Sequence, residues 1–182
     1  DGPRAEPCVA CGGPGENQRD GRQNSPGVRF AEFESVKRGD RSEFPIAVTT
    51  YSVTEHWQTG GQTRTCPALN EAMPEQFVEM SVELAAEKGI ENGERVRVFN
   101  NRGSVEVMAL VTPRFKPFKV NGETVHQVGM THHFGWAGDF ATGDIVNDLP
   151  PNVGGPTRWV PASKAFAVDI ANAKEGGAPH VN

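Results

Sequence analysis

The sequence predicts a mainly β protein with short helices, folded as a barrel and preceded by an extended arm. Several segments alternate apolar and polar residues, the pattern of a strand with one face in a core. Glycine (21) and proline (14) are frequent among the 182 residues, so the chain must turn often between short elements. A strand, a short capped helix, a strand, a hairpin and a further strand follow one another. This order favours a barrel over a parallel βαβ sheet.

Residues 1–43 read as an extended arm or linker that is rich in proline and glycine and lacks a periodic apolar pattern. Within it, Cys8 and Cys11 form a single C-x2-C pair. No second pair of ligands follows at zinc-finger spacing, so a surface disulfide or two free thiols is favoured over a metal site. With Cys66 the number of cysteines is three, so at least one thiol is unpaired within the chain. The cysteines therefore do not indicate the cellular compartment. The short run 28–33 is expected to anchor the arm on the domain.

The globular part is expected to begin near Phe44, with a β-branched strand over 45–53. This strand leads into the most hydroxyl-rich stretch of the chain, residues 49–65, which holds six threonines, a Glu-His-Trp triplet and a Gly-Gly pair. Hydroxyls, backbone N–H groups beside glycines and a nearby arginine suit a polyanionic ligand such as a pyrophosphate. A polar loop without a ligand is the alternative that composition leaves open.

The clearest local signals surround a short helix. The pattern predicts a strand over 77–80 and a helix over 82–88, with Ser81 as its N-cap. Gly89 is placed to end the helix in a left-handed conformation, and Ile90 is the apolar partner of a Schellman motif.

A hairpin is predicted next. Alternation predicts strands over 95–99 and 104–111, and the turn at 100–103 is built from residues that tolerate a positive φ.

The remaining elements are shorter. An Asn121-Gly122 turn joins two short strands within 118–125. Residues 143–155 read as a loop, 164–170 alternate as a last strand, and 173–182 are expected to fray.

Residues 131–136, THHFGW, place two adjacent histidines beside aromatic rings at a predicted strand end. Neighbouring residues of a strand point to opposite faces, and no third ligand lies nearby, so a metal site is disfavoured. The favoured interpretation is the wall of a ligand cavity. The alternative is a rim of half-buried aromatic side chains with imidazoles facing solvent.

Charge and hydropathy argue against two classes of partner. The net charge is −5 and the lysines and arginines are dispersed, so nucleic-acid binding is not expected. No apolar run approaches the ~20 residues that span a bilayer, so direct membrane insertion is not expected. The chain begins with Asp1 and not with Met, which indicates a piece of a longer protein or a processed product.

Several segments, taken in order, resemble a known family. They are T-x-x-x-T-E-H-W-x-T-G from Thr50, then PEQFVE, HHFGW, IVNDLPP and SKAFAVDI. This order resembles the C-terminal dinucleotide-binding domain of molybdenum and tungsten enzymes that carry two pyranopterin guanine dinucleotides. PEQFVE and GMTHHFGW look most like the catalytic subunit of respiratory-type formate dehydrogenases. No single motif is specific, but the ordered set is.

The resemblance implies a double-psi β-barrel of the aspartate-decarboxylase-like type over 44–172, which closes over the cofactor and helps to bury it. It implies no catalytic residue and no metal ligand in this chain. An ammonium suits a phosphate, and a carboxamide suits the edge of a heterocycle. By position in the matching motifs, the implied cofactor-binding residues are Thr50, Tyr51, Thr54, Glu55, His56, Trp57, Thr59, Gly60, His133, Asn147 and Lys164.

The implied activity is that of a formate dehydrogenase, which oxidises formate to CO2 and releases two electrons. The implied cofactor is bis-molybdopterin guanine dinucleotide with molybdenum or tungsten. Such enzymes need a cysteine or selenocysteine ligand and iron–sulfur cysteines, and neither Cys66 nor the Cys8/Cys11 pair matches those motifs. The expected partners are therefore the rest of the large subunit and an iron–sulfur electron-transfer subunit.

A periplasmic location and a role in anaerobic respiration are further expectations from the resemblance. One alternative is the same cofactor-binding role in a nitrate reductase or a formylmethanofuran dehydrogenase. The other is a non-catalytic double-psi barrel that serves as an interaction module.

Overall fold

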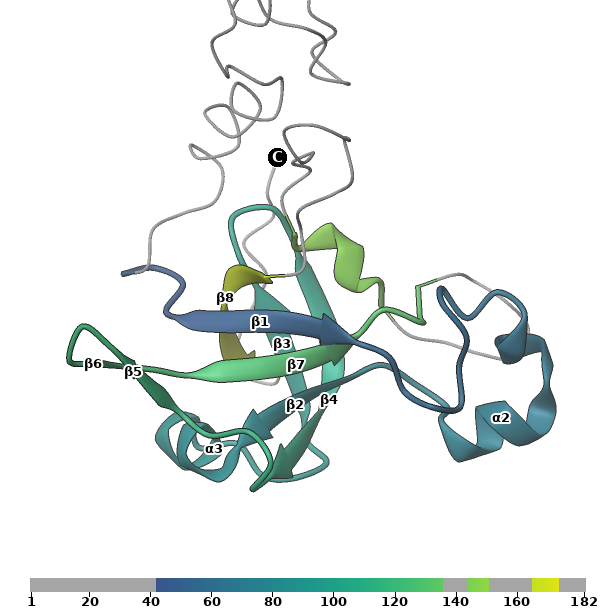
Figure 1. Ribbon diagram of the computed structural model, residues 1–182, viewed down its shortest axis with the longest axis horizontal. Coiled ribbons are helices and arrows are strands. Elements are labelled where there is room, and N and C mark those ends of the chain that lie inside the picture. The colour runs from purple at the N-terminus through teal and green to yellow at the C-terminus, as the bar shows by residue number, and fades with distance from the viewer. Residues whose placement is uncertain (1–41, 136–143, 151–164, 174–182) are drawn as a thin grey trace, which may run out of the picture.

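The computed structural model describes residues 42–135, 144–150 and 165–173 (Figure 1). The predicted anchor at 28–33, the Cys8/Cys11 pair and nearly all of the predicted C-terminal tail lie outside these residues. The limits of the barrel domain, 44–172, stay a prediction.

The described part is built from eight strands and four short helices. The strands are β1 (Ile46–Tyr51), β2 (Phe77–Ser81), β3 (Arg95–Phe99), β4 (Ser104–Thr112), β5 (Phe118–Val120), β6 (Glu123–Val125), β7 (Gln127–Thr131) and β8 (Ala165–Asn172). The helices are η2 (Thr63–Thr65), α2 (Pro67–Ala72), α3 (Val82–Lys88) and η3 (Val146–Asp148).

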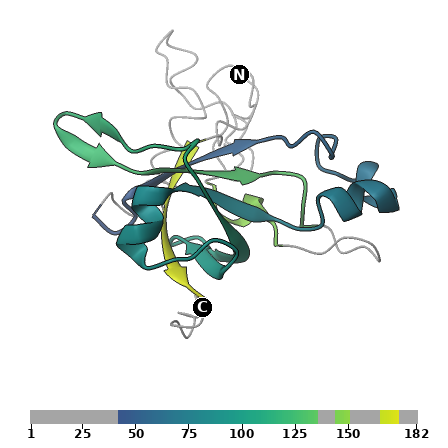
Figure 2. The ribbon, with the colours of Figure 1, turned by 90° about the horizontal axis from the view of Figure 1, so that it is seen from below.

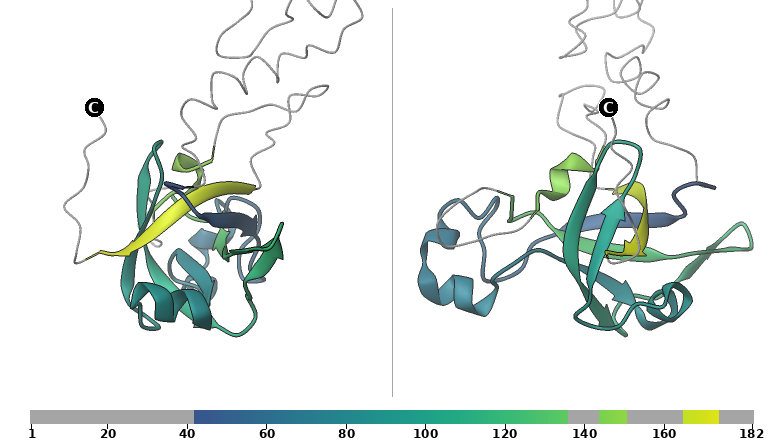
Figure 3. Two further views of the ribbon diagram at one scale, coloured as in Figure 1. Left: turned by 90° about the vertical axis from the view of Figure 1, so that its left-hand side faces the viewer. Right: turned by 180° about the vertical axis from the view of Figure 1, so that it is seen from behind.

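Six of the strands close into a barrel in the order β1-β7-β2-β4-β3-β8, with β8 paired to β1 (Figures 1 and 3). Two pairs are parallel, β1 with β7 and β2 with β4, and the other neighbours are antiparallel. A closed six-stranded barrel with two parallel pairs is the arrangement of a double-psi barrel. The predicted mainly β fold class is confirmed.

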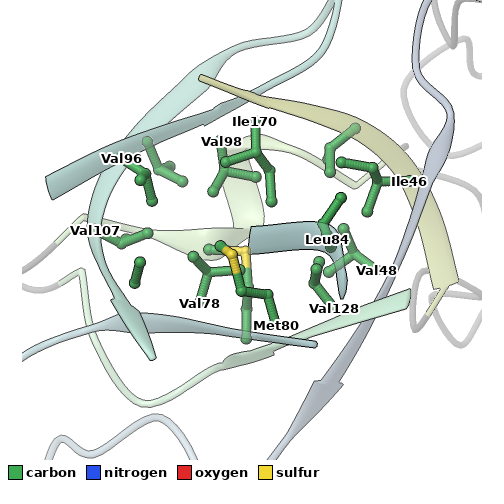
Figure 4. Close-up of a cluster of buried hydrophobic side chains, with 14 of the residues drawn as sticks. Ile46, Val48, Val78, Met80, Leu84, Val96, Val98, Val107, Val128 and Ile170 are labelled. Carbon is green, nitrogen blue, oxygen red and sulfur yellow. The ribbon is translucent and has the colours of Figure 1, made fainter. Parts of the chain in front are cut away.

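Valine, isoleucine and methionine side chains from all six barrel strands fill the interior (Figure 4). On β4, Val105, Val107 and Ala109 are buried while Ser104 and Glu106 are exposed, as the alternation predicts. Leu84 and Ala85 of α3 join the same cluster. Each fully buried aliphatic side chain contributes about 1.5–3 kcal/mol.

The signals around α3 are confirmed at both ends. The Ser81 hydroxyl accepts a hydrogen bond from the backbone N–H of Leu84 at 3.1 Å. Gly89 adopts φ +65°, and the Ile90 N–H donates to the Ala85 carbonyl at 2.9 Å, which is the Schellman bond.

The two predicted turns differ in outcome. Asn121 and Gly122 have φ of +51° and +86°, so the β5–β6 hairpin uses the left-handed conformation that its sequence predicts (Figure 2). The predicted turn at 100–103 joins β3 to β4, but none of its residues has a positive φ. The side chain of Asn100 builds this turn instead, since its Oδ1 accepts from the N–H of Arg102 at 2.9 Å.

Three short helices escape the sequence prediction. η2 lies at the end of the hydroxyl-rich stretch, and α2 begins two residues after η2 ends. Pro67 is the first residue of α2, a position that favours proline. η3 lies in a segment expected to be a loop. The β1 strand also ends at Tyr51, two residues earlier than predicted, and the polar residues beyond it leave the sheet.

Candidate functional site

The polar loop, residues 52–62, leaves the barrel at the edge where β1 and β7 both end. These strands are parallel, with Tyr51 opposite Thr131, so the segments that follow them emerge side by side. Together with η2 and α2, the loop forms a projection from one side of the barrel (Figures 1 and 3).

His133 fastens this loop from the segment after β7. Its side chain is fully buried, at 0% exposure. The backbone N–H of Val53 donates to Nε2 at 2.9 Å, and Nδ1 bonds the carbonyl oxygen of Gln58. A carbonyl only accepts, so Nδ1 carries the proton and Nε2 is the acceptor. The ring is therefore the neutral Nδ1–H tautomer.

The surroundings of His133 favour this neutral form. Burial lowers the pKa of His133. The hydrogen bond to Gln58 acts in the other direction, while the neighbouring His132, His56 and Arg64 lower the pKa further. The net pKa lies below the ordinary value of a histidine.

The two adjacent histidines do not alternate as strand residues do. β7 ends at Thr131, so His132 and His133 lie in a bend, with ring centroids 4.5 Å apart. The expectation that they point to opposite faces is wrong for this reason. The buried ring of His133 also excludes the rim with solvent-facing imidazoles for that residue.

His56 is the second buried histidine of the site. Its Nε2 donates to the carbonyl of Met73 at 2.8 Å, and its Nδ1 lies 3.1 Å from the hydroxyl of Thr63. That hydroxyl also accepts from the N–H of Trp57 at 3.1 Å. Its ring packs edge-on against Phe134 at 5.3 Å. Both ring nitrogens of His56 are thus bonded within the protein.

Gly60 is the residue at which the polar loop comes close to the backbone of His133. It has φ +78°, and a Cβ there would collide with the carbonyl oxygen of His133 and lie 2.9 Å from Nε of Arg64. Its N–H donates to Trp57 at 2.8 Å and closes a turn in which Gln58 has φ +47°. Only glycine fits this position.

The outward groups of the loop are hydroxyls and one indole ring. Thr54 and Thr59 are exposed, and Glu55 is half-buried. Trp57 is the most exposed large hydrophobic side chain of the described residues, at 63%. An aromatic ring so exposed beside hydroxyls offers a stacking surface next to hydrogen-bond donors. Thr50, at the end of β1, is half-buried.

Asn147 lies on η3 and is exposed. Gly135, four residues beyond β7, packs against the side chain of Ile145, where a Cβ would collide. Asn100 donates to the carbonyl of Leu149 at 2.9 Å and ties the other end of η3 to β3. Lys164 and Trp136 lie outside the described residues.

Tyr51 faces a buried carboxylate on the outside of the barrel. Its hydroxyl donates to Glu79 at 2.6 Å, and Thr112 donates to the same carboxylate at 2.8 Å. Arg114 covers the pair, donating through Nε at 2.7 Å and also through Nη2. Burial raises the pKa of Tyr51 above its usual range, and the bond to Glu79 raises it further.

The Tyr51 ring and Arg114 also line an open pocket of about 680 Å3. Phe115, Lys116 and Phe118 are also among the residues that line it. Tyr51 was predicted to bind the cofactor, but its hydroxyl is engaged with Glu79 in this structure.

Two buried polar residues of this region, Gln76 and Glu79, are not among the residues that the sequence predicts for the site. Gln76 donates to the carbonyl of Thr131 at 2.5 Å and joins the start of β2 to the end of β7. Arg64, the arginine of the hydroxyl-rich stretch, is buried on η2. Glu79 had a readable signal, because a carboxylate inside the apolar run FVEM must find partners when the strand is buried.

The outward groups of the described residues suit the arm of a dinucleotide. Among the described residues, no group of three histidine, cysteine or acidic side chains is placed to hold a metal. The exposed hydroxyls of Thr54 and Thr59 can form hydrogen bonds with phosphate oxygens. The indole of Trp57 can stack on a planar ring, and the amide of Asn147 can form hydrogen bonds with the edge of such a ring. No helix in the described part of the chain is both long and apolar enough to cross a membrane.

Comparisons with known proteins agree with this chemistry. The family model of the molydopterin dinucleotide binding domain matches residues 46–167. Formate dehydrogenase subunit alpha of Megalodesulfovibrio gigas is 43% identical over 150 residues, which are 82% of this chain and 15% of that protein. The nitrate-inducible formate dehydrogenase major subunit of Escherichia coli (strain K12) is 44% identical, with the same two coverages.

The chain thus spans about 15% of the length of these curated relatives. Among solved structures, acetylene hydratase from Pelobacter acetylenicus superposes with a TM-score of 0.56 at 12% identity, over 76% of this chain and 20% of that chain. This likeness supports the fold alone. The family match covers most of the barrel and the whole polar loop, and the chain belongs to the molydopterin dinucleotide binding domain family.

Proposed function

We propose that this chain is the dinucleotide-binding part of the large subunit of a formate dehydrogenase. The observation that carries the proposal is the identity of 43–44% with formate dehydrogenase subunits over 82% of the chain. The polar loop supports it, because its outward groups are those that a pyrophosphate and a planar heterocycle need.

The cofactor proposed is bis-molybdopterin guanine dinucleotide with molybdenum or tungsten, shared with the rest of the subunit. When bound, it supplies the redox centre at which formate becomes CO2, a proton and two electrons. The residues of this chain bind and orient it. Thr54 and Thr59 donate to phosphate oxygens, Trp57 stacks on a ring, and Asn147 bonds a ring edge.

The metal ligand and the iron–sulfur clusters are proposed to lie elsewhere, in the rest of the large subunit and in an iron–sulfur electron-transfer subunit. A periplasmic location and a role in anaerobic respiration are also proposed. They rest on the resemblance to respiratory-type enzymes.

The test is made on the native complex that contains this chain. We expect it to oxidise formate, and we expect extraction to release guanine dinucleotides of pterin. Nitrate reduction without formate oxidation would assign the chain to another enzyme of the superfamily. A complex without pterin would overturn the proposal in favour of an interaction module.

Trp57→Ala gives a sharper test of the loop. Trp57 is 63% exposed, so its removal should leave the fold intact and lower the pterin content of the purified complex several-fold, by loss of stacking. Val82→Ala is the matched control, since Val82 is 52% exposed but lies on α3. Equal pterin content in the two variants would contradict the role of Trp57. Lys164→Ala is likewise expected to lower cofactor content.

A further inference from the structure

We propose that His133 is a positioning residue, which fixes residues 54–57 in the conformation that meets the cofactor without itself touching the cofactor. The inference rests on the proposed function of the polar loop. It changes the role of His133 from the direct contact that the resemblance implies to a support beneath the contact.

The first argument is the geometry of the two hydrogen bonds. One imidazole ring bonds the N–H of Val53 and the carbonyl of Gln58, the residues that immediately flank 54–57. The ring therefore joins the two ends of the segment 54–57. Its side chain is fully buried, so no ring atom is left to face a ligand. The part of the loop between the two bonds contains Thr54 and Trp57, which do face outward.

The second argument is the strain that the loop carries. Gln58 has φ +47°, a left-handed conformation that costs a non-glycine residue free energy and persists only where the surroundings hold it. The hydrogen bond from His133 to the carbonyl of Gln58 stabilises this left-handed conformation of Gln58. Gly60 brings the same loop into contact with the backbone of His133, leaving no room for a Cβ. The loop is thus shaped around this one histidine.

The third argument is that the support works only with a neutral ring. Nε2 must accept from Val53, so a proton on Nε2 would break that bond. Among the described residues, the titratable groups that face the ring are His132, His56 and Arg64, and each of them disfavours a positive charge there. Acid should therefore release the loop at Val53 while the barrel core remains folded.

The test uses hydrogen–deuterium exchange of the native complex, read on peptides that cover residues 53–60. His133→Leu removes both bonds, whereas His133→Gln keeps an acceptor and a donor on one neutral amide. We expect exchange over 53–60 to rise at least tenfold in His133→Leu and to stay near that of the unaltered chain in His133→Gln. Peptides from β3 and β4 report whether the barrel is intact.

His126→Leu is the matched control. His126 precedes the opposite end of β7 and bonds Glu87 on α3 at 3.0 Å, so its loss should leave the polar loop protected. Pterin content per complex should fall in His133→Leu and recover in His133→Gln. Unchanged exchange over 53–60 in His133→Leu, with β3 and β4 protected, would overturn the proposal.

The pH profile separates positioning from general stability. As pH falls from 8 to 5, exchange over 53–60, corrected for its intrinsic rate, should rise in the unaltered chain and stay flat in His133→Gln. Parallel profiles in the two proteins would also overturn the proposal. Absence of pterin from the unaltered complex would instead sink the proposed function, and the exchange data would still decide the role of His133.

Discussion

Gly60 shows how closely the polar loop is fitted at the scale of single residues. Its positive φ and its contact with the backbone of His133 act together, because a side chain would meet both a strained conformation and a collision. Gly61, the next residue, has open space around it, with the hydroxyl of Thr59 at 4.0 Å as its only close neighbour.

Gly60→Ala should therefore lower the free energy of unfolding of the 182-residue chain by about 2 kcal/mol or more, and Gly61→Ala by less than about 1 kcal/mol. Urea titration of both variants checks this. If both variants lose the same unfolding free energy, the backbone at Gly60 can move to accept a side chain and is not held in place against His133.

Glu79 is the second residue with an unusual environment. It is almost fully buried, and burial by itself raises the pKa of its carboxyl group. The hydrogen bonds from Arg114, Tyr51 and Thr112 outweigh burial and hold the pKa below its usual range. The carboxylate therefore contributes stability above its unfolded pKa of about 4.5, and this stability is lost as pH falls below that value.

Arg114→Ala should cost about 1–3 kcal/mol of unfolding free energy at pH 7. The figure lies below that of a fully buried pair because the Arg114 side chain is 68% exposed. The difference from the unaltered chain should narrow between pH 5 and 3, as Glu79 becomes protonated. Lys119→Ala, an exposed cation on β5, should show neither effect. A pH-independent loss in Arg114→Ala would show that packing, and not charge, supplies the stability.

At the scale of elements, α3 is the part of the fold that its own residues define most completely. A capping hydroxyl, an acidic first turn, a left-handed glycine and an apolar residue beyond it all lie within ten positions. The polar loop is the opposite case, since its conformation depends on His133, Met73 and Thr63 from other segments.

Ser81→Ala should destabilise the chain by about 1 kcal/mol, because the N–H of Leu84 loses its acceptor. Thermal unfolding followed by circular dichroism measures the change. Ser104→Ala is the control, since Ser104 is an exposed residue on β4. If Ser104→Ala destabilises the chain by the same amount, the loss at Ser81 does not come from the N-cap hydrogen bond.

At the scale of the whole molecule, β8 closes the barrel. It pairs with β1 on one side and β3 on the other, and its Val168 and Ile170 enter the core that all six strands share. A barrel closed in this way has no open sheet edge, so its strands should lose their structure together.

Val168→Ala should lower the unfolding free energy by about 1–3 kcal/mol, because it removes buried methyl groups and leaves a cavity. Val120→Ala, the same change at a side chain 38% exposed on β5, should cost much less. Far-ultraviolet circular dichroism and hydrogen exchange of peptides from the six barrel strands should give one shared transition in each protein. Separate transitions would mean that the barrel does not unfold as a unit.

The elements that could be predicted are those whose signals lie close together along the chain. The α3 helix, the β3–β4 and β5–β6 hairpins and the alternation of β4 follow from residues within a few positions of each other. The same reasoning failed for His132 and His133, because it assumed that the strand continued past Thr131. The length of that strand depends on how its partners pair.

By itself, the sequence determined the mainly β class, the capped helix, the stretch of hydroxyls and, through its ordered motifs, the family. Only the tertiary structure decided which strands are parallel and how β8 closes the barrel. It also decided that His56 and His133 face inward while Trp57 faces outward. The physical reason is distance along the chain: His133 bonds residues 75 and 80 positions away, and no local pattern encodes such a bond.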